Sequence, residues 1–203
     1  YTCLAPMHPD AAFCKTDHWH SHKPDQPFFS VINFTVTHES RNWLTGKAHV
    51  KVTSRVTDKQ RHDPANVSLP PFHPDTPEMR MNWANYYDNI TQMDYQVADV
   101  LAELNEDGLA DSTIVFFYSD HGVGLPSCKK WIWDWGLRVP LLIYFPPKYR
   151  HLAPCDPGGA CDRLVSFVDF APTLLSLTEV TIPGHMQGVA FLGEKIGHGR
   201  QFH

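Results

Sequence analysis

The sequence predicts an α/β fold in which a mostly parallel or mixed sheet is flanked by helices. Three observations lead to this prediction. A long amphipathic helical pattern runs from Thr76 to Leu104, and the apolar run Thr113–Ser119 follows it closely. Two further apolar runs, Phe28–Phe34 and Leu141–Phe145, are also predicted as strands, and the near-continuous run Phe28–Phe34 fits a strand buried on both faces. Because strands that alternate with helices usually run parallel, this order of elements predicts a largely parallel sheet.

The long helix is predicted by its start, its apolar face and its end. Thr76 offers an N-cap hydroxyl, Pro77 fits the first turn, and Glu78 lies near the positive end of the helix dipole. Polar residues and Gly108 end the pattern. Apolar side chains recur at gaps of three and four residues, which places them on one face: Trp83, Tyr86, Ile90, Met93, Val97, Leu101 and Leu104.

Other segments are predicted more simply. Residues 1–26 form a loop-rich lead-in, and residues 45–72 form a long polar excursion of the kind that is usually functional or flexible. Asp169 is predicted to cap a shorter helix through Leu177. In the lead-in, charged neighbours favour a solvated loop over a metal site for three alternating histidines: His18, His20 and His22.

The sequence Asp120-His121-Gly122 stands where the strand Thr113–Ser119 ends. In α/β proteins, the carboxyl ends of strands present reactive side chains outside the sheet. Gly122 and Gly124 allow a sharp turn, so that the adjacent carboxylate and imidazole can converge. Such a pair suits a metal ion or acid–base chemistry. A capped loop with a solvated histidine is the alternative that spacing alone leaves open.

Further segments fall in a definite order around this motif. Lys129 lies seven residues before Gly136, which opens the sequence Gly-Leu-Arg-Val-Pro. An apolar run ends at His38 upstream, and the segments 167–177 and 182–188 follow downstream. Taken in order, from about Pro27 to Lys195, these segments resemble the sulfatases of the alkaline phosphatase superfamily. The resemblance implies an alkaline-phosphatase-like fold, with residues 27–203 forming part of the sulfatase α/β domain.

The resemblance also implies a chemistry and a set of site residues. Sulfatases hydrolyse sulfate esters, or N-sulfates in some branches, with a formylglycine nucleophile and a divalent metal. Asp120 and His121 match two of the metal ligands, and Lys129 matches the lysine that contacts the sulfate, with Lys130 as the fallback. His38 matches the histidine that binds sulfate or protonates the leaving oxygen. His38 and Lys129 are therefore the predicted catalytic and substrate-binding residues.

The family usually binds calcium, but calcium prefers oxygen ligands, so the imidazole of His121 leaves manganese, magnesium or zinc open. Glu39 is not expected to be catalytic, although it could touch a sugar hydroxyl. Arg138 is expected to tie loops together. Half-buried packing is favoured over stacking on a sugar ring for three aromatic residues: Trp131, Trp133 and Trp135.

The chain departs from the family in its nucleophile. The family motif is Cys/Ser-x-Pro/Ala-x-Arg, whereas the nearest match begins at Cys3 and has Met7 in place of the arginine. The sequence holds no Asp-Asp pair, and the small carboxyl-terminal sheet of sulfatases is not found by His203. The prediction is therefore a middle-to-late portion of a sulfatase, inactive alone, with the formylglycine expected in the missing amino-terminal part.

Composition excludes some partners. The net charge of −5, without a run of Lys or Arg, argues against nucleic acid. No apolar stretch approaches the roughly eighteen residues of a spanning helix. Among five cysteines, Cys155 and Cys161 bracket a turn that a disulfide could close, and a reduced pair is the alternative. The family places the protein in the periplasm, the lysosome or a secreted compartment.

The leading hypothesis is a sulfatase fragment acting on a small-molecule or polysaccharide sulfate ester, with a sulfated saccharide as the expected substrate. A phosphodiesterase or phosphonate hydrolase of the same superfamily is the second hypothesis, because such enzymes share the Asp-His pair and the lysine. A non-catalytic domain that binds a metal or a glycan is the third.

Overall fold

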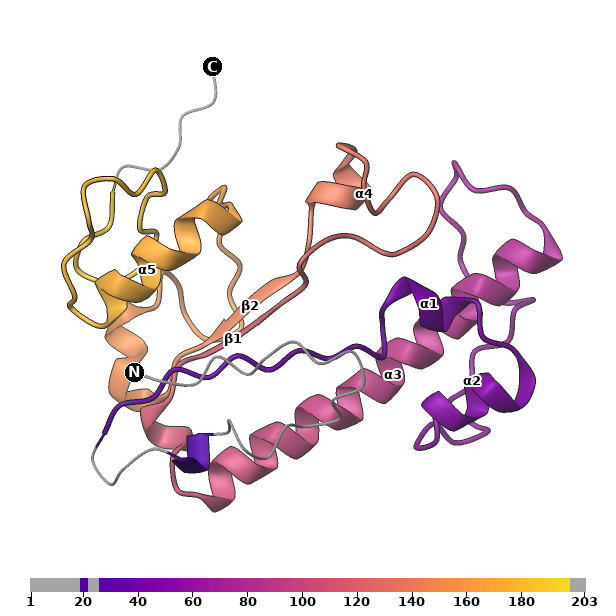
Figure 1. Cartoon of the computed structure of the whole chain (residues 1–203), viewed down its shortest axis with the longest axis horizontal. Coiled ribbons are helices and arrows are strands. Elements are labelled where there is room, and N and C mark those ends of the chain that lie inside the picture. The colour runs from indigo at the N-terminus through magenta and orange to yellow at the C-terminus, as the bar shows by residue number, and fades with distance from the viewer. Residues whose placement is uncertain (1–18, 22–25, 198–203) are drawn as a thin grey trace. The chain divides into compact units, whose positions relative to one another are not determined.

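The computed structural model describes residues 19–21 and 26–197, and the chain divides into two compact units (Figure 1). Unit 1 comprises residues 1–103 and 119–139, and unit 2 comprises residues 104–118 and 140–203. Every predicted site residue lies in unit 1. Two cysteines, Cys3 and Cys14, and two histidines, His18 and His22, lie outside the described residues.

Unit 1 is built around one long helix. The helical elements assigned to it are η1 (Trp19–Ser21), α1 (Glu39–Asn42), α2 (Gly46–Val52), α4 (Asp134–Leu137) and most of α3 (Pro77–Glu106). The predicted cap of α3 is confirmed, because the hydroxyl of Thr76 accepts a hydrogen bond of 3.2 Å from the backbone N–H of Met79. Gly108, with a φ of 70°, ends the helix in the left-handed region.

The apolar face of α3 is confirmed in part. Trp83 and Leu104 are buried, but Leu101 is 45% exposed and belongs to neither hydrophobic core of the described residues. The core of unit 1 joins α3 to two distant segments, because Trp83 and Ala84 pack against Val67 and Leu125. The indole N–H of Trp83 also donates to Nδ1 of His73 at 3.0 Å, and Nε2 of His73 in turn donates to the carbonyl of Pro126 at 2.7 Å.

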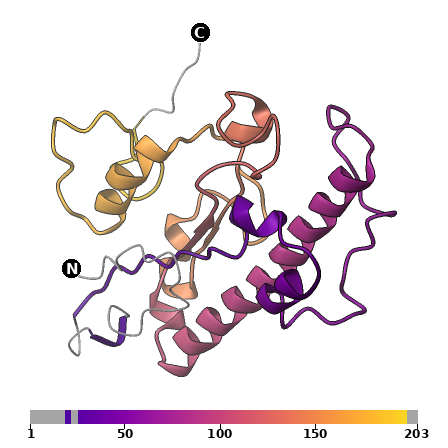
Figure 2. The same ribbon diagram turned by 45° about the vertical axis from the view of Figure 1, so that its right-hand side comes forward.

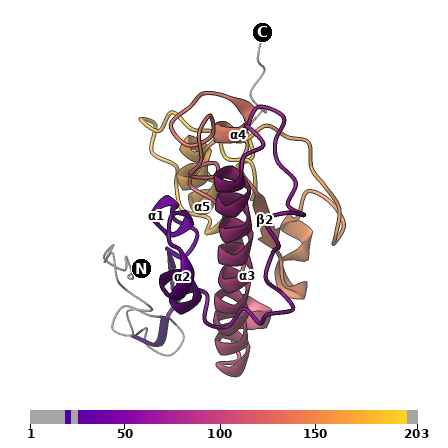
Figure 3. The same cartoon turned by 90° about the vertical axis from the view of Figure 1, so that its right-hand side faces the viewer.

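A second face of α3 is polar and nevertheless buried, and the hydrophobic pattern of the sequence does not predict its burial. Its members are Asn85, Asp88, Asn89 and Gln92. Asn85 donates to the backbone carbonyl groups of Asn42 and Leu44, and Asn89 donates to the side chain of Asn42. These bonds hold α1 and the residues just after it beside α3 (Figure 3). These four residues are polar, so a hydrophobic pattern could not predict their burial. Their hydrogen-bond partners in other segments explain it.

Asp88 is the centre of this polar face. Its carboxylate accepts hydrogen bonds from Arg61 at 2.9 Å and from the backbone and ring of His62 at 2.9 and 3.0 Å, and it lies 3.3 Å from the ring of His49. Burial alone would raise the pKa of Asp88, but the bonds from His49, His62 and Arg61 together lower this pKa to about 2. The carboxylate therefore stays ionised in the interior.

The segment 45–72 was predicted as a long surface loop that is functional or flexible. The surface-loop part of this prediction is wrong. It contains α2, and its side chains Thr53, Val56 and Val67 are buried. The contacts with Asp88 fix its middle to α3. Its polar composition reflects pairing with the polar face of the helix rather than solvation.

Unit 2 contains the two strands of the described residues. These are β1 (Val115–Tyr118) and β2 (Leu141–Tyr144), which confirm the strands predicted over 113–119 and 141–145. They pair antiparallel, with Val115 opposite Tyr144 and Tyr118 opposite Leu141. The remaining elements of unit 2 are η2 (Ala110–Ser112), η3 (Pro147–Leu152), η4 (Phe167–Asp169) and α5 (Phe170–Leu177). Its core contains Phe145, Phe191 and Leu192.

The strand predicted over Phe28–Phe34 is wrong for this structure. The segment runs into α1 as irregular backbone, drawn as a tube without an arrow in Figure 2. A strand requires a neighbour that bonds to its backbone, and no backbone ladder joins this segment to other described residues. The antiparallel ladder in unit 2 does not test the predicted parallel sheet, which stays a prediction.

The shorter helix ends at Leu177 as predicted, but its cap differs. Asp169 is buried, and its side chain accepts from the backbone N–H of Ser166 and of Val189, both at 2.9 Å. It closes a capping box around η4 and makes no cap bond to α5. Within the described residues, no helix has both the length and the apolar composition needed to cross a bilayer.

Replacing Asp88 with Asn is expected to lower the free energy of unfolding by about 3 kcal/mol, because Arg61 and two histidines lose a buried counter-charge. The pKa of this carboxyl falls from 3.8 to about 2 on folding, so its stabilising contribution is present above pH 4 and is lost as the pH falls toward 2. Urea unfolding followed by circular dichroism at several pH values measures both effects.

The matched control is Asp94→Asn, which removes an exposed carboxylate from the same helix, where it makes no hydrogen bond or ion pair with other described residues. Its free energy of unfolding should stay within about 0.5 kcal/mol of the wild type. Equal losses in the two variants would show that Asp88 does not anchor the segment 45–72.

Candidate functional site

The loop that follows β1 carries Asp120 and His121. The hydroxyl of Ser119 donates to the carbonyl of His121 at 2.6 Å, and the N–H of Gly122 donates to the carbonyl of Gly136 at 3.1 Å. A Cβ atom at Gly122 would lie 1.8 Å from the carbonyl oxygen of Trp135. Gly122 is therefore required by close approach of two backbone segments. The sharp turn predicted from its conformational freedom is not the reason, since its φ is not positive.

Asp120 and His121 face each other. The ring nitrogen Nδ1 of His121 lies 2.6 Å from the carbonyl oxygen of Gly122, and a carbonyl can only accept, so Nδ1 carries the hydrogen. The lone pair is then on Nε2, which lies 3.6 Å from a carboxylate oxygen of Asp120. The Asp120 side chain is 84% exposed. A histidine ligand that donates its second N–H to a backbone carbonyl is the usual arrangement at metal centres.

This geometry fits a cation between the two side chains. Metal–ligand distances of about 2.0 to 2.4 Å bring neighbouring donor atoms to roughly the separation seen here. The pair supplies two donors only: among residues 19–21 and 26–197, no cluster of three or more acidic, cysteine or histidine side chains could hold a metal ion. Further ligands would have to come from elsewhere in the protein.

Lys129 is presented by a tight turn on the same loop. Ser127 and Lys130 have φ values of 63° and 71°, in the left-handed region, and the N–H of Lys129 donates to the carbonyl of Val123 at 3.0 Å. The Lys129 side chain is only 18% exposed, and its Nζ lies 3.1 Å from a carboxylate oxygen of Glu39. The exposed Lys130, the fallback in the prediction, makes no such ion pair among the described residues.

His38 lies at the start of α1. Its Nδ1 accepts a hydrogen bond of 3.3 Å from the backbone N–H of Ser40 and lies 2.9 Å from the hydroxyl of Ser40. The side chain therefore serves as the N-cap of α1. Since Nδ1 accepts from a backbone N–H, the ring hydrogen is on Nε2, which is left as a donor.

Glu39 joins these two segments. A Cβ at Gly124 would lie 2.3 Å from the Cβ of Glu39, so the loop after β1 packs directly on the first residue of α1. The hydrogen bond from Lys129 lowers the pKa of Glu39, the opposing effect of burial is smaller, and the charges of Lys129, Lys130 and His38 lower it further. The structure thus brings Lys129 close to the His38–Glu39 segment. No hydrogen bond or ion pair in the described residues links Asp120 or His121 to Lys129 or His38, so a common pocket stays a prediction.

Comparison with known proteins gives a consistent result. The family model described as Sulfatase matches residues 5–180. The chain is 38% identical over 202 residues to an ulvan-active sulfatase of Formosa agariphila, with 87% of this chain and 33% of the relative covered. It is 33% identical over 139 residues to the N-sulphoglucosamine sulphohydrolase of Homo sapiens, with 68% of this chain and 26% of the relative covered.

The chain belongs to the sulfatase family. An arylsulfatase of Clostridium perfringens is also similar, at 32% identity over 112 residues that cover 53% of this chain and 22% of the relative. The chain thus spans between about a fifth and a third of the length of these curated relatives. Membership implies the alkaline-phosphatase-like α/β fold, and sulfatases generally use a divalent metal and a formylglycine.

The three tryptophans of the loop after β1 are about half exposed, so the packing predicted for them stays a prediction. Trp131, Trp133 and Trp135 are 55%, 61% and 47% exposed, and Trp135 contacts the ring of Phe72 edge-on with centroids 5.5 Å apart. Stacking on a sugar, the alternative, stays open. The side chain of Arg138 is exposed and makes no hydrogen bond or ion pair within the described residues, so its expected role as a tie between loops stays a prediction.

Three cysteines and His20 lie within the described residues but outside the candidate site. Cys155 and Cys161 are exposed and free, whereas Cys128 is buried and free. This structure therefore has the reduced pair in the 155–161 turn. His20 lies in η1, 3.7 Å from Glu103, in keeping with a loop histidine. The nearest match to the sulfatase nucleophile motif, Cys3 to Met7, lies outside the described residues.

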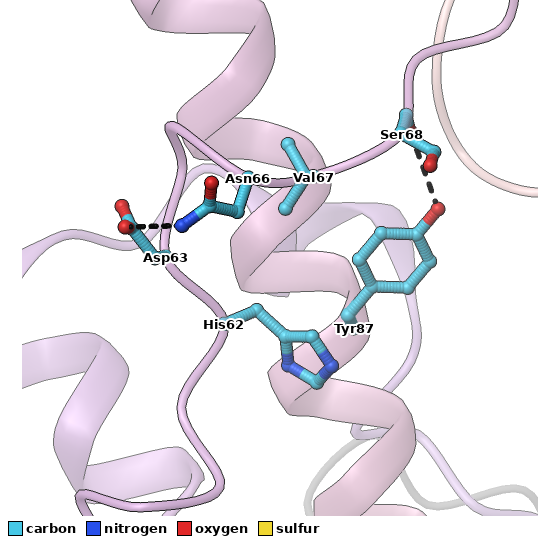
Figure 4. A pocket seen from close by; sticks show the side chains of 6 residues that line it. All are labelled: His62, Asp63, Asn66, Val67, Ser68 and Tyr87. Carbon is cyan, nitrogen blue, oxygen red and sulfur yellow. Dashed lines mark hydrogen bonds between the residues drawn. The ribbon is translucent and has the colours of Figure 1, made fainter.

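A separate hollow of about 260 Å³ lies against α3 (Figure 4). Its lining residues are His62, Asp63, Asn66, Val67, Ser68 and Tyr87. The hydroxyl of Tyr87 donates to the carbonyl of Ser68, and the amide of Asn66 donates to Asp63. None of the predicted site residues lines this hollow. His62 bonds to Asp88 outside the hollow, so most of the polar side chains lining the hollow already have partners within the fold.

Substitution of Gly122 by Ala is expected to lower the free energy of unfolding by about 2 kcal/mol, because the added methyl group overlaps the Trp135 carbonyl and the loop must shift. Thermal unfolding checks this expectation. Gly184→Ala is the control, since a Cβ there meets nothing within 4 Å. A Gly122→Ala protein as stable as Gly184→Ala would contradict the close approach.

Proposed function

We propose that the complete protein containing this chain hydrolyses the sulfate ester of a sulfated saccharide, and that this chain supplies residues that bind the sulfate and protonate the leaving group. Membership of the sulfatase family supports the reaction. The names of the relatives support the substrate class, since they mention ulvan and a sulphated glucosamine. The expected site lies in unit 1.

The observation that carries the proposal is the position of Lys129. A largely buried ammonium beside the His38–Glu39 segment is a compact charge that can donate to more than one sulfate oxygen. Restricted contact with solvent strengthens its attraction to an anion. In the proposed site Lys129 binds the sulfate and neutralises charge that develops on its oxygens during the reaction.

His38 is proposed to protonate the leaving oxygen. As the sulfur–oxygen bond breaks, the departing alkoxide needs a proton, and an imidazole is the side chain best suited to supply one near neutral pH. The hydrogen bond that Nδ1 accepts from the backbone of Ser40 leaves the Nε2 hydrogen available for this task. The same bond fixes the orientation of the ring.

Asp120 and His121 are proposed as two of the metal ligands. A divalent metal, when bound, would hold the sulfate and the nucleophile and withdraw charge from both. The carboxylate offers a hard oxygen, and Nε2 of His121 offers a nitrogen whose orientation is set by the Gly122 carbonyl. Calcium is the ion expected from the family, and the mixed donor pair also suits manganese, magnesium or zinc. The formylglycine is expected from the rest of the protein.

The proposed activity is tested with the complete protein, matured with formylglycine and loaded with metal. A panel of sulfated saccharides and one phosphodiester should give turnover of at least one sulfate. Lys129→Ala is expected to reduce kcat/KM by about a hundredfold, because a charge that neutralises the reacting sulfate is removed. Turnover of the phosphodiester with failure on every sulfate would favour the phosphodiesterase hypothesis, and failure on both with retained glycan binding would favour a non-catalytic domain.

His121→Ala in the complete protein is expected to lower the metal content, measured by elemental analysis after dialysis, by about tenfold or more. His151→Ala is the control, because His151 is exposed in η3 and has no partner among the described residues. Unchanged metal content in His121→Ala would refute the ligand assignment while leaving the sulfate-binding residues unaffected.

A further inference from the structure

The cation proposed to bind sulfate already has an anionic partner. The Nζ of Lys129 lies 3.1 Å from Oε2 of Glu39, and the two side chains are 18% and 32% exposed. A carboxylate oxygen at this distance takes one of the places that a sulfate oxygen would take. A ligand that binds to Lys129 must therefore either displace Glu39 or share the ammonium with it.

The backbone holds the two partners near each other. Glu39 is the first residue of α1, which is capped by His38, and its main chain packs against Gly124. Lys129 is fixed by the bond from its N–H to Val123 on the same loop. The backbone therefore keeps the two side chains within reach of each other, and sharing the ammonium requires no rearrangement.

Sharing is chemically possible, because an ammonium group has three N–H donors. One donor directed at Glu39 leaves two for a ligand. The pKa of Glu39 is lowered by the hydrogen bond from Lys129 and by the nearby charges, so the carboxylate remains anionic in the presence of these groups. A sulfate bound to Lys129 would then lie close to a fixed negative charge.

We propose that Glu39 makes the Lys129 site select anions by charge, and so favours a sulfate ester over inorganic sulfate. This inference rests on the proposed function. The sulfate group of an ester bears one negative charge, whereas the sulfate released by hydrolysis bears two. At a similar distance, the carboxylate repels the dianion about twice as strongly as the monoanion. Glu39 is thus a specificity residue that assists release of the product.

The test compares two simple anions, methyl sulfate as the monoanion and inorganic sulfate as the dianion. Their dissociation constants are measured by titration calorimetry with the complete, metal-loaded protein. Glu39→Gln is expected to tighten methyl sulfate by about threefold and inorganic sulfate by about tenfold, since doubling a repulsion energy squares its effect on binding. The ratio of the two constants is the readout.

Three variants support the comparison. Glu39→Asp keeps the charge and should keep a ratio near that of the wild type. Asp75→Asn removes a carboxylate from a different ion pair of unit 1, the one with Arg80, and should leave both constants unchanged. Glu39→Ala removes the same charge as Glu39→Gln with a smaller side chain, and it replaces that variant if Glu39→Gln does not fold.

The outcomes separate this inference from the proposed function. Equal tightening of the two anions, or weaker binding of both, would overturn it, because Glu39 would then act by shape or by orienting Lys129. Failure of the wild type to bind either anion would overturn it as well. Turnover is measured separately: charge selection without hydrolysis of any sulfate would count against the proposed function alone.

Discussion

The contact between the loop after β1 and the start of α1 is the constraint on which the candidate site depends. Gly124 leaves room for the main chain of Glu39, and the Lys129–Glu39 ion pair joins the same two segments through their side chains. His38 and Lys129 are about ninety residues apart in the sequence, and this contact brings their segments together. The chemistry proposed for the pair requires the close approach of two backbones, which a single glycine permits.

This contact needs a rigid support, and the polar face of α3 provides it. The amide side chains of Asn85 and Asn89 hold α1 and the residues after it, while the carboxylate of Asp88 holds the segment around His62. Hydrogen bonds are directional, so such a network fixes one arrangement of the chain more strictly than apolar contacts do, even though Asn42 and Asn89 each leave one buried amide atom unpaired among the described residues. Burying these polar groups costs desolvation free energy, but the network fixes the position of α1 and hence of His38.

The electrostatics of the site follow from the same arrangement. A lysine that is largely buried would be a strong attractor of anions if it were alone, but Glu39 moderates its charge. The loop also carries three exposed tryptophans near the lysine in sequence, which leaves an aromatic surface available beside a cationic residue. Both features are compatible with a ligand that combines an anionic group and a sugar ring.

The sequence by itself determined the local elements and the family. Thr76 and Gly108 mark the ends of α3, and the runs that became β1 and β2 are apolar and short, because caps and strand propensities act between near neighbours. The ordered motifs around Asp120 and Lys129 were sufficient to recognise a sulfatase.

Partners distant in the sequence were decided only by the tertiary structure. Among the described residues, the run 28–34 has no strand neighbour and Leu101 lies outside the core, Gly122 is needed for a close approach, and Glu39 lies against Lys129. Each of these outcomes depends on which surfaces meet in three dimensions, and no periodicity along the chain records that.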